Sequence, residues 1–467
     1  MRARRLVAAW RTTSLHHRIK VLTIRVLREL LARDRFGLIS NSVFVFTCRV
    51  LGAMLTFTTQ VVLARVMGAA ELGLYMLTFS VCVVLSTVFT FGYPIAAVPV
   101  IGQALVFGNW EAVKGFIRRG HQLTSGIALL LACTAALMLL AGVEMIANVR
   151  ATFFIITFLI IPFFVLTYFH YNLALAFSWF GLPIVVSLVI RPLVFLLFVL
   201  LLSFARRPLS AELALLGQLA IQTTLVAGEF LMLRSRLRNR LRGIPSSYDM
   251  PKWIRISLPL LVYGLFTGYF PEISIILCGL FLSPEEIAIY SVSYRTALLI
   301  TFGISSVTAI ACTQAAQLHA REDHASLQRL VTNTTCVTVV GALAGVLLLL
   351  LFGRQLLNLF GPEFTVGFQC LIILAFSQLV IAMTGPVAGL LANTGHQDLC
   401  VLVCGVTACL TAVLTPMLVP TLGLNGGATA VLLVTLCWTF WMHRLVVRHL
   451  RIHPSILAVR QFSGADQ

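Results

Sequence analysis

Three arginines and two glutamates stand within apolar stretches long enough to cross a membrane. The arginines are Arg49, Arg191 and Arg295, and the glutamates are Glu229 and Glu272. A charged side chain inside a bilayer is costly, so such residues usually face a protein interior or a wet cavity and often mark a transport pathway. Two acids cannot neutralise three arginines one to one, and excess positive charge in a wet interior suits an anionic ligand. Arginine also binds phosphate oxygens through two parallel hydrogen bonds.

Each arginine has two possible roles, and the sequence leaves both open. The first role is contact with an anionic substrate, which fits Arg49 and Arg295 better than Arg191, because Arg191 lies deep in a nearly unbroken apolar segment. The second role is a buried ion pair that fastens helices together, with Glu229 or Glu272 as the acidic partner. Glu272 could equally be a packing anchor or a carboxylate that couples transport to a cation.

Polar side chains share helical faces with two of the arginines. Gln60 falls within about 60° of Arg49 on a helical wheel, and Arg295 begins a stripe that ends at Gln317. His170 lies mid-helix in the segment "TYFHYN", where an interfacial aromatic belt does not apply and a ring with polar edges suits a sugar. The candidate substrate cavity therefore contains Arg49, Arg191, Arg295, Gln60, Gln317 and His170.

Composition indicates that these residues belong to a polytopic membrane protein. The chain has 467 residues, of which 59% are hydrophobic and 11% are charged, against roughly 25% charged in a soluble domain. The apolar runs lack period-2 alternation and are too long for barrel strands, so we expect an all-α fold.

Gly and Pro interrupt the runs at 91–102 and 384–395, where irregular backbone is tolerated only against protein or a wet cavity. About twelve spanning helices are predicted, at 39–64, 73–100, 122–142, 152–175, 179–203, 211–233, 257–281, 286–316, 330–352, 365–391, 398–419 and 426–446.

The basic residues behind the formal charge of +18 are distributed unevenly between the segments that connect the apolar runs, and this distribution indicates the membrane topology. Basic residues, including the run "RSRLRNRLR", fall on the side of both termini when the number of spans is even. We therefore predict cytoplasmic termini, basic segments that face anionic membrane lipids, and no nucleic-acid partner. The predicted parts are a basic amphipathic arm (1–38), a six-helix bundle (39–233), a basic linker (234–256), a second six-helix bundle (257–446) and a basic tail (447–467).

A phrase at the start of the second predicted helix recurs at the start of the eighth. "AELGLYMLTFS" (70–80) is matched by "EEIAIYSVSYR" (285–295). The shared glutamate fits a short outer turn and the shared tyrosine fits an interfacial ring, whereas Arg295 is matched only by Ser80. The two bundles are thus predicted to be parallel repeats, and transporters built in this way bind substrate between the repeats near the midplane.

No cofactor, metal site or catalytic motif is predicted. The sequence contains no Walker A, G-x-S-x-G or H-E-x-x-H pattern. His396, Cys400 and Cys404 have helical spacing, but the further polar ligands and second shell that a metal needs are not visible. We therefore expect a transporter rather than an enzyme, with its energy taken from a gradient or from a separate protein.

Four segments resemble the signatures of bacterial polysaccharide flippases. They are "LARVMGAAELGLYMLTFSV" (63–81), "LFLSPEEIAIYSVSYR" (280–295), "FGPEFTVGFQCLIILAF" (360–376) and "LGLNGGATA" (422–430). These flippases are the O-antigen and exopolysaccharide branch of the multidrug/oligosaccharidyl-lipid/polysaccharide exporter (MOP) superfamily. The resemblance covers most of 39–446 and implies a MATE-like, V-shaped pair of six-helix bundles.

The resemblance also implies a function and its site. Members move an undecaprenyl-diphosphate-linked oligosaccharide across the bacterial inner membrane by alternating access, with Arg49 and Arg295 expected to meet the diphosphate. A polysaccharide polymerase and a chain-length regulator are expected partners. The family often has an aspartate in helix seven where this chain has Ser274, two residues after Glu272. Two other functions stay open: a cation-coupled drug or metabolite antiporter of the same superfamily, and a membrane polymerase or ligase acting on the same lipid carrier.

Overall fold

The computed structural model describes residues 35–142, 145–146, 149–179, 181–205, 209–321, 323–393, 397–450 and 452. The chain divides into two units, Met1–Leu51 and Gly52–Gln467. Most of the predicted basic arm, and all but a few residues of the predicted basic tail, lie outside the described residues. The candidate residues other than Arg49 therefore belong to the second unit.

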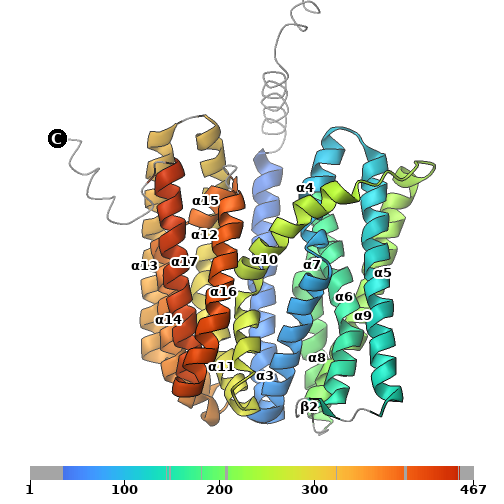
Figure 1. Cartoon of the computed structure of the whole chain (residues 1–467). Coiled ribbons are helices and arrows are strands. Elements are labelled where there is room, and N and C mark those ends of the chain that lie inside the picture. The colour runs from blue at the N-terminus through green and yellow to red at the C-terminus, as the bar shows by residue number, and fades with distance from the viewer. Residues whose placement is uncertain are drawn as a thin grey trace, which may run out of the picture. The chain divides into compact units, whose positions relative to one another are not determined.

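Helices make up nearly all of the described chain (Figure 1). The first half contains α3 (Arg35–Phe89), α4 (Tyr93–Val106), α5 (Trp110–Leu140), α6 (Ala151–Ala176), α7 (Leu182–Val185), the π-helical η1 (Val186–Ile190), α8 (Arg191–Phe204) and α9 (Ala211–Leu241). A short antiparallel hairpin of β1 (Met145–Ile146) and β2 (Val149–Arg150) joins α5 to α6. The second half contains α10 (Met250–Cys278), α11 (Pro284–Ala297), α12 (Leu299–Ala320), α13 (His324–Asn358), the 3₁₀-helical η2 (Pro362–Gly367), α14 (Phe368–Met383), α15 (Val387–Asn393), α16 (Gln397–Leu422) and α17 (Leu424–Leu450).

Among the described residues, ten helices are long and apolar enough to cross a membrane. The prediction of an all-α polytopic membrane protein is thus confirmed. The predicted segments 286–316 and 365–391 each extend over two consecutive helices, α11 with α12 and α14 with α15. In addition, α3 joins two helices across a kink. Because these segments are broken or merged, the count of about twelve crossings stays a prediction.

The breaks occur where glycine allows backbone that other residues rarely adopt. Gly68 has φ 75° and ψ 173° at the kink of α3. Gly92, with φ 71°, precedes α4, and Gly385, with φ 64°, separates α14 from α15. Positive φ values of this size carry no steric penalty for glycine. The interruptions expected at 91–102 and 384–395 therefore coincide with real breaks in the helices.

Within the described part of the second unit, three apolar cores hold the helices together. The largest contains residues of both halves, among them Leu72 and Tyr290. A second core lies in the second half around Met442, and a third lies in the first half around Phe116 and includes Trp253 at the start of α10. One core is therefore shared by the two halves, a second lies within the second half, and the third joins the first half to the start of α10.

The two copies of the repeated phrase contact each other in the shared core. A Cβ added to Gly73 of α3 would lie 1.7 Å from the carbonyl oxygen of Pro284 in α11. Tyr290 is 0% exposed and shares a 2.6 Å hydrogen bond with Ser274 of α10. Tyr75 is only 5% exposed. The expectation of interfacial rings was wrong, because both tyrosines are buried in the shared core.

The glutamates of the two copies both stabilise the start of a helix. Glu286 accepts a hydrogen bond from the backbone N–H of Ser283 at 2.9 Å and completes a capping box on α11. Glu71 accepts one from the backbone N–H of Ala211, the first residue of α9, at 2.6 Å. Helix starts leave such N–H groups without partners inside the helix. The repeated glutamate therefore serves folding in both halves.

Arg65 adds polar bonds to the joint between the halves. Its Nε donates to the carbonyl oxygen of Leu359 at 2.8 Å, and its Nη2 donates to that of Asn358 at 2.6 Å. These carbonyls lie at the C-terminal end of α13, where carbonyls lack partners within the helix and a cation is favoured. Nearby, Phe57 packs edge-on against Phe360 with ring centres 5.4 Å apart. Polar and aromatic contacts thus both link α3 to the second half.

Gly73→Ala is expected to lower the thermal unfolding midpoint of the protein in detergent. The added Cβ would overlap the Pro284 carbonyl and force α3 away from α11, and overpacking of this kind costs about 1–3 kcal/mol. Gly102→Ala on α4 is the matched control, because a Cβ there meets no atom within 4 Å. Equal midpoints for the two variants would contradict the close packing of the repeated segments.

Candidate functional site

Arg295 lies in the last turn of α11, beside Glu272 of α10. Its Nη2 is 3.6 Å from Oε1 of Glu272, and the two side chains are 19% and 16% exposed. This distance is that of an ion pair but exceeds the usual range for an N–H···O hydrogen bond. Nε and Nη2 of Arg295 are shielded from solvent and have no hydrogen-bond partner. A shielded guanidinium with unused donors suits a ligand that offers acceptor oxygens.

Glu272 is positioned just after a kink in α10. Tyr269 leaves the helical conformation, with φ −125° and ψ 18°, two residues before Pro271. Proline has no backbone N–H and clashes with the preceding turn, so it bends a helix at this point. In the structure α10 packs against α4 of the first half and α16 of the second (Figure 1). Glu272, the acidic member of this ion pair, therefore lies on a helix that contacts both halves.

The first half has no counterpart of this pair. Ser80 occupies the position aligned with Arg295, is 0% exposed, and its hydroxyl oxygen has no hydrogen-bond partner. The same offset in the sequence matches Glu272 with Phe57, which packs in the joint between the halves. The charge pair thus belongs to one repeat only. Such asymmetry suits a ligand that carries its charge at one end.

A second charge cluster is buried inside the first half. Arg191 Nη2 donates to Oε1 of Glu229 at 2.9 Å, and Nδ1 of His170 lies 3.4 Å from Oε2 of Glu229. Nε2 of His170 lies in turn 3.3 Å from Nε2 of His121 on α5. Arg191, Glu229 and His170 are all buried, with exposed fractions of 9%, 5% and 2%. The cluster therefore joins α5, α6, α8 and α9.

A π-helical turn precedes Arg191. Residues Val186–Ile190 form this turn, and α8 then begins with Arg191 and Pro192. Proline prevents the regular hydrogen-bond pattern from continuing through this point, and π-helical turns within helices are frequent at functional sites. Gly52 of α3 packs directly on the turn, since a Cβ there would lie 2.2 Å from the carbonyl oxygen of Leu188. The π-helical turn before Arg191 thus has a local cause, which is Pro192, and a packing cause, which is the close contact of Gly52 with Leu188.

Among the described residues, the side chains of Gln60 and Gln317 form no hydrogen bond or ion pair with these two clusters, and Arg49 belongs to the other unit. Gln60 is buried in α3, and Gln317 is exposed on α12. Arg49 is exposed in the first unit. A role in substrate binding stays a prediction for all six residues proposed from the sequence. His396 of the rejected metal spacing lies outside the described residues.

Sequence reasoning missed His121. Its only signal is a histidine inside an otherwise apolar helix, and no spacing rule links it to His170, which lies 49 residues later. The Ser274–Tyr290 hydrogen bond was also missed, because each residue taken alone fits an ordinary helix interior. Both contacts form because particular helices pack against each other, and the sequence alone does not predict which helices are neighbours.

Ser274→Ala is expected to destabilise the protein by about 1–3 kcal/mol, because it removes the 2.6 Å hydrogen bond between Ser274 and the Tyr290 hydroxyl in a fully buried position. Thermal unfolding in detergent measures the effect. Adding Tyr290→Phe to this variant removes the hydroxyl that has lost its serine partner and should recover part of the loss. A double variant as unstable as the sum of the two single variants would show that the hydrogen bond is not the cause.

Solved structures of membrane exporters share this fold. An inward-facing multidrug resistance MATE family transporter of the MOP superfamily has a TM-score of 0.68 and 12% identity, covering 88% of this chain and 99% of its own. The lipid II flippase MurJ in an inward closed conformation has a TM-score of 0.66 and 14% identity, covering 87% of each chain. A MOP superfamily transporter from Pyrococcus furiosus has a TM-score of 0.61 and 12% identity, covering 88% of this chain and 96% of its own. None of the curated protein sequences matches the chain.

The chain therefore has the fold of solved MOP superfamily exporters, and its described part contains ten helices long and apolar enough to cross a membrane. More particularly, the chain belongs to the family of polysaccharide biosynthesis proteins. A sequence model of that family matches residues 38–312, which is more than half of the 467 residues. The family resemblance and the fold class inferred from the sequence are thereby confirmed.

Proposed function

We propose that this protein moves a polyprenyl-diphosphate-linked oligosaccharide from the cytoplasmic to the outer leaflet of a bacterial inner membrane by alternating access. The unused donors of Arg295 carry this proposal, because they occur in a member of the polysaccharide biosynthesis family. A diphosphate presents several acceptor oxygens, and a guanidinium binds two of them through its planar fork. The polyprenyl tail stays in lipid, so only the polar headgroup enters the protein.

Glu272 balances the charge of Arg295 while the site is empty. The 3.6 Å separation gives attraction without a hydrogen bond, so little is lost when a more strongly charged diphosphate takes the place of the carboxylate. Arg295 then exchanges one anionic partner for another, so the charge of its guanidinium stays compensated. A charge without a partner at that depth would be costly.

The membrane potential favours the proposed direction of transport. Moving an anion outward from an inside-negative cell is favoured by roughly 2.3 kcal/mol per charge per 100 mV. A diphosphate headgroup carries more than one negative charge, so the potential alone assists export. The proposed mechanism therefore does not require nucleotide hydrolysis by this chain.

The linker supports the proposed orientation, with both termini in the cytoplasm. Arg236 lies over the ring of Trp179 at 5.1 Å, and Arg240 lies over the ring of Trp110 at 5.8 Å. Arginine on an aromatic ring at a helix end is typical of the zone that faces lipid headgroups. Anionic lipids are the expected partners of this surface. A polysaccharide polymerase and a chain-length regulator are the expected protein partners, since they act on the exported units.

A cation-coupled drug or metabolite antiporter is the second candidate, favoured by the likeness to MATE family transporters. Such an antiporter needs carboxylates that are available to a cation or a basic drug. Here Glu229 and Glu272 each lie beside an arginine, which favours an anionic substrate. A polymerase or ligase on the same carrier has less support, because such enzymes usually need a large outer loop.

Deleting the gene in the source organism tests the proposed function. We expect lipid-linked glycan units to accumulate on the cytoplasmic leaflet, and a plasmid copy of the wild-type gene should reverse the accumulation. Units that reach the outer leaflet but stay unpolymerised would contradict a flippase and favour the polymerase. Unchanged glycan with increased sensitivity to cationic drugs would favour the antiporter.

A further inference from the structure

A cavity of about 340 Å³ lies where α4 ends and where α5 and α10 begin. Its volume falls within the range of about 300–1,000 Å³ that is typical of sites for small molecules. Gln103 of α4, Asn109 before α5 and Lys252 of α10 are among the residues that line it. The basic linker predicted from the sequence therefore contributes one wall of a cavity with space for a ligand.

Local hydrogen bonds and close packing hold the walls of this cavity in place. Gly108, with φ 66°, turns the chain between α4 and α5, and the side chain of Asn109 accepts a hydrogen bond from the first turn of α5. The linker is fastened to α5, because the backbone N–H of Ser247 donates to the carbonyl oxygen of Glu111 at 3.1 Å. A Cβ added to Gly115 would overlap the carbonyl oxygen of Ser247. The cavity is therefore formed before a ligand enters, which lowers the free-energy cost of binding.

One positive and one negative side chain line the cavity without pairing with each other. Asp249 is the N-cap of α10, and its Oδ1 accepts from the backbone N–H of Lys252 at 3.3 Å. Within the described part of the chain, neither the Asp249 carboxylate nor the Lys252 ammonium forms an ion pair. Two separate charges of opposite sign are complementary to a zwitterion, which binds at two points.

Two further hydrogen-bond donors lie beside these charges. Trp253 lines the cavity and is 3% exposed, yet its indole N–H donates to none of the described residues. The side-chain amide of Gln103 also has no partner within this part of the chain. Buried polar groups are usually hydrogen-bonded, so these donors indicate a ligand with several acceptors. A phosphate has the oxygens to which Lys252, Trp253 and Gln103 can all donate.

We propose that this cavity, the headgroup cavity, binds the headgroup of a phospholipid that carries both a phosphate and an amine, as phosphatidylethanolamine does. The phosphate lies against Lys252, Trp253 and Gln103, and the ammonium lies against Asp249. The proposal does not rest on the proposed function, because neither the glycan nor Arg295 has a part in it.

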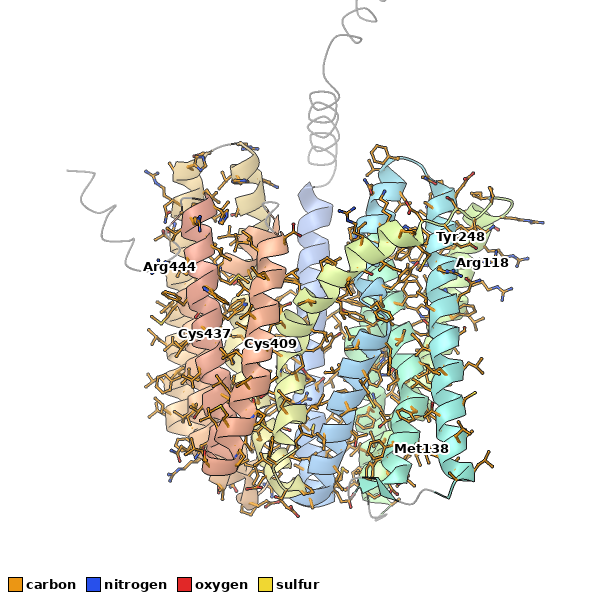
Figure 2. The ribbon with its side chains drawn as sticks, in the orientation of Figure 1. Arg118, Met138, Tyr248, Cys409, Cys437 and Arg444 are labelled. Carbon is orange, nitrogen blue, oxygen red and sulfur yellow. The ribbon has the colours of Figure 1, made fainter. Side chains whose placement is uncertain are left out.

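The surroundings of the headgroup cavity fit the surface of a bilayer. Trp110 and Tyr248 are each next in sequence to a lining residue, and they lie under Arg240 and Arg119, at 5.8 and 5.9 Å. Figure 2 shows Tyr248 at this end of the first half. Phe107 lines the cavity and is 76% exposed. Arginines and aromatic rings at helix ends are typical of the headgroup zone, and an exposed apolar ring beside the cavity fits the start of an acyl chain.

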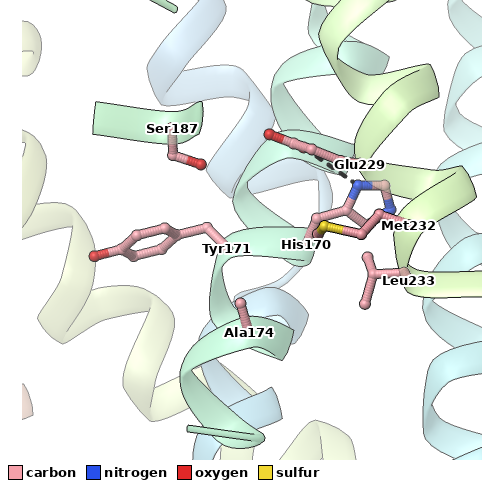
Figure 3. Close-up of a pocket in the computed structure, with 7 residues that line it drawn as sticks. All are labelled: His170, Tyr171, Ala174, Ser187, Glu229, Met232 and Leu233. Carbon is pink, nitrogen blue, oxygen red and sulfur yellow. Dashed lines mark hydrogen bonds and ion pairs between the residues drawn. The ribbon is translucent and has the colours of Figure 1, made fainter. Parts of the chain in front are cut away.

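Charge and size argue against two simpler assignments. An anionic headgroup such as phosphoglycerol has no positive group for Asp249, and the carboxylate would repel its phosphate. The cavity beside His170 and Glu229 holds only about 10 Å³, which is room for about one water molecule (Figure 3). A zwitterionic headgroup in the larger cavity gives a partner to the ammonium, the carboxylate and both neutral donors.

A bound headgroup also links three helices. It contacts residues of α4, of the segment that begins α5, and of α10, and α10 already packs against α4. A ligand stabilises the conformation to which it binds best. Phosphatidylethanolamine is therefore expected to stabilise the described arrangement of these helices against unfolding.

Thermal unfolding of the purified full chain, freed of phospholipid in detergent, tests lipid binding. A ligand of the folded state raises the unfolding midpoint as its concentration increases. Phosphatidylethanolamine should do so at a mole fraction at least about tenfold lower than phosphatidylglycerol, because one charge-assisted contact is worth about tenfold or more in affinity. Equal effects of the two lipids would overturn the proposal. Soluble phosphoethanolamine has the same charges without acyl chains, and a shift as large as that of the lipid would overturn a lipid as the occupant.

Three variants locate the binding. Lys252→Met should need at least about tenfold more phosphatidylethanolamine for the same shift. Asp249→Asn keeps a good N-cap but loses the charge, so its preference for phosphatidylethanolamine over phosphatidylglycerol should disappear. Both residues are exposed, so both variants are expected to fold. Arg255→Met is the matched control, since Arg255 is exposed on the same helix but does not line the cavity. A wild-type response of Lys252→Met, or an unchanged preference in Asp249→Asn, would show that the headgroup cavity is not the site.

Discussion

Arg295→Ala is expected to reduce the outward translocation of lipid-linked glycan by at least about 100-fold. Two charge-assisted hydrogen bonds to a diphosphate contribute about 1.5–3 kcal/mol each, and every 1.4 kcal/mol is about tenfold. The variant should still insert in the membrane, because the 3.6 Å contact with Glu272 contributes little to folding. The measurement is complementation of the deletion strain, combined with the leaflet distribution of the glycan and the amount of protein in the membrane.

Three further variants separate substrate contact from a purely structural role of Arg295. Arg444→Ala is the matched control, because Arg444 is exposed on α17 and lies over Phe440 (Figure 2). Arg295→Lys keeps the charge but loses the planar fork, so we expect intermediate activity. The double variant Arg295→Ala/Glu272→Gln should remain inactive. Recovery of transport in the double variant would mean that the pair only holds helices together, and the substrate role would be wrong.

Glu229→Leu is expected to cause the largest loss of stability of any single substitution in the first half's charge cluster. It would leave the buried guanidinium of Arg191 without its acidic partner, and breaking a buried ion pair from one side typically costs about 3–5 kcal/mol. The expected result is a strongly reduced yield of folded protein and a lower thermal unfolding midpoint. Size-exclusion chromatography after heating steps measures both quantities.

The reason for this loss is tested by removing the other partner as well. Arg191→Met in the Glu229→Leu background replaces the isolated charge by an apolar side chain of similar length, and should restore much of the stability. A double variant no more stable than Glu229→Leu alone would show that the loss arises from packing rather than from an uncompensated charge. This result would leave the arrangement of α8 against α9 unexplained by electrostatics.

The helices and their breaks could be predicted because their causes are local. Apolar runs of about 20 residues form helices in a membrane, and the glycines at 92 and 385 break them because of their own backbone conformations. The repeated phrase was visible for the same reason, since its alignment requires only the sequence. The π-helical turn before Arg191 was not predicted, because one additional residue in a turn leaves the composition unchanged.

The two charge clusters could be predicted only in part. Helical periodicity predicts on which face of a helix a residue lies, but it does not predict which other helix packs against that face. Arg191 and Glu229 were each recognised as unusual charges, yet they are 38 residues apart. Their pairing depends on the packing of α8 against α9. The burial of Tyr290 was predicted wrongly for a similar reason. Its place near a segment end indicated the membrane interface, whereas Tyr290 is buried in the core that both halves share.

The shared apolar core has a consequence for the energetics of the transport cycle. In the proposed function, alternating access requires the two halves to part where Leu72 and Tyr290 now pack in one core. In water this would expose apolar surface at a large free-energy cost, but lipid tails are as apolar as the side chains they would replace. The barrier therefore resides mainly in a few polar contacts, such as those of Arg65 with the end of α13. Opening of this joint into lipid should accordingly show a small heat-capacity change, unlike the unfolding of a soluble domain.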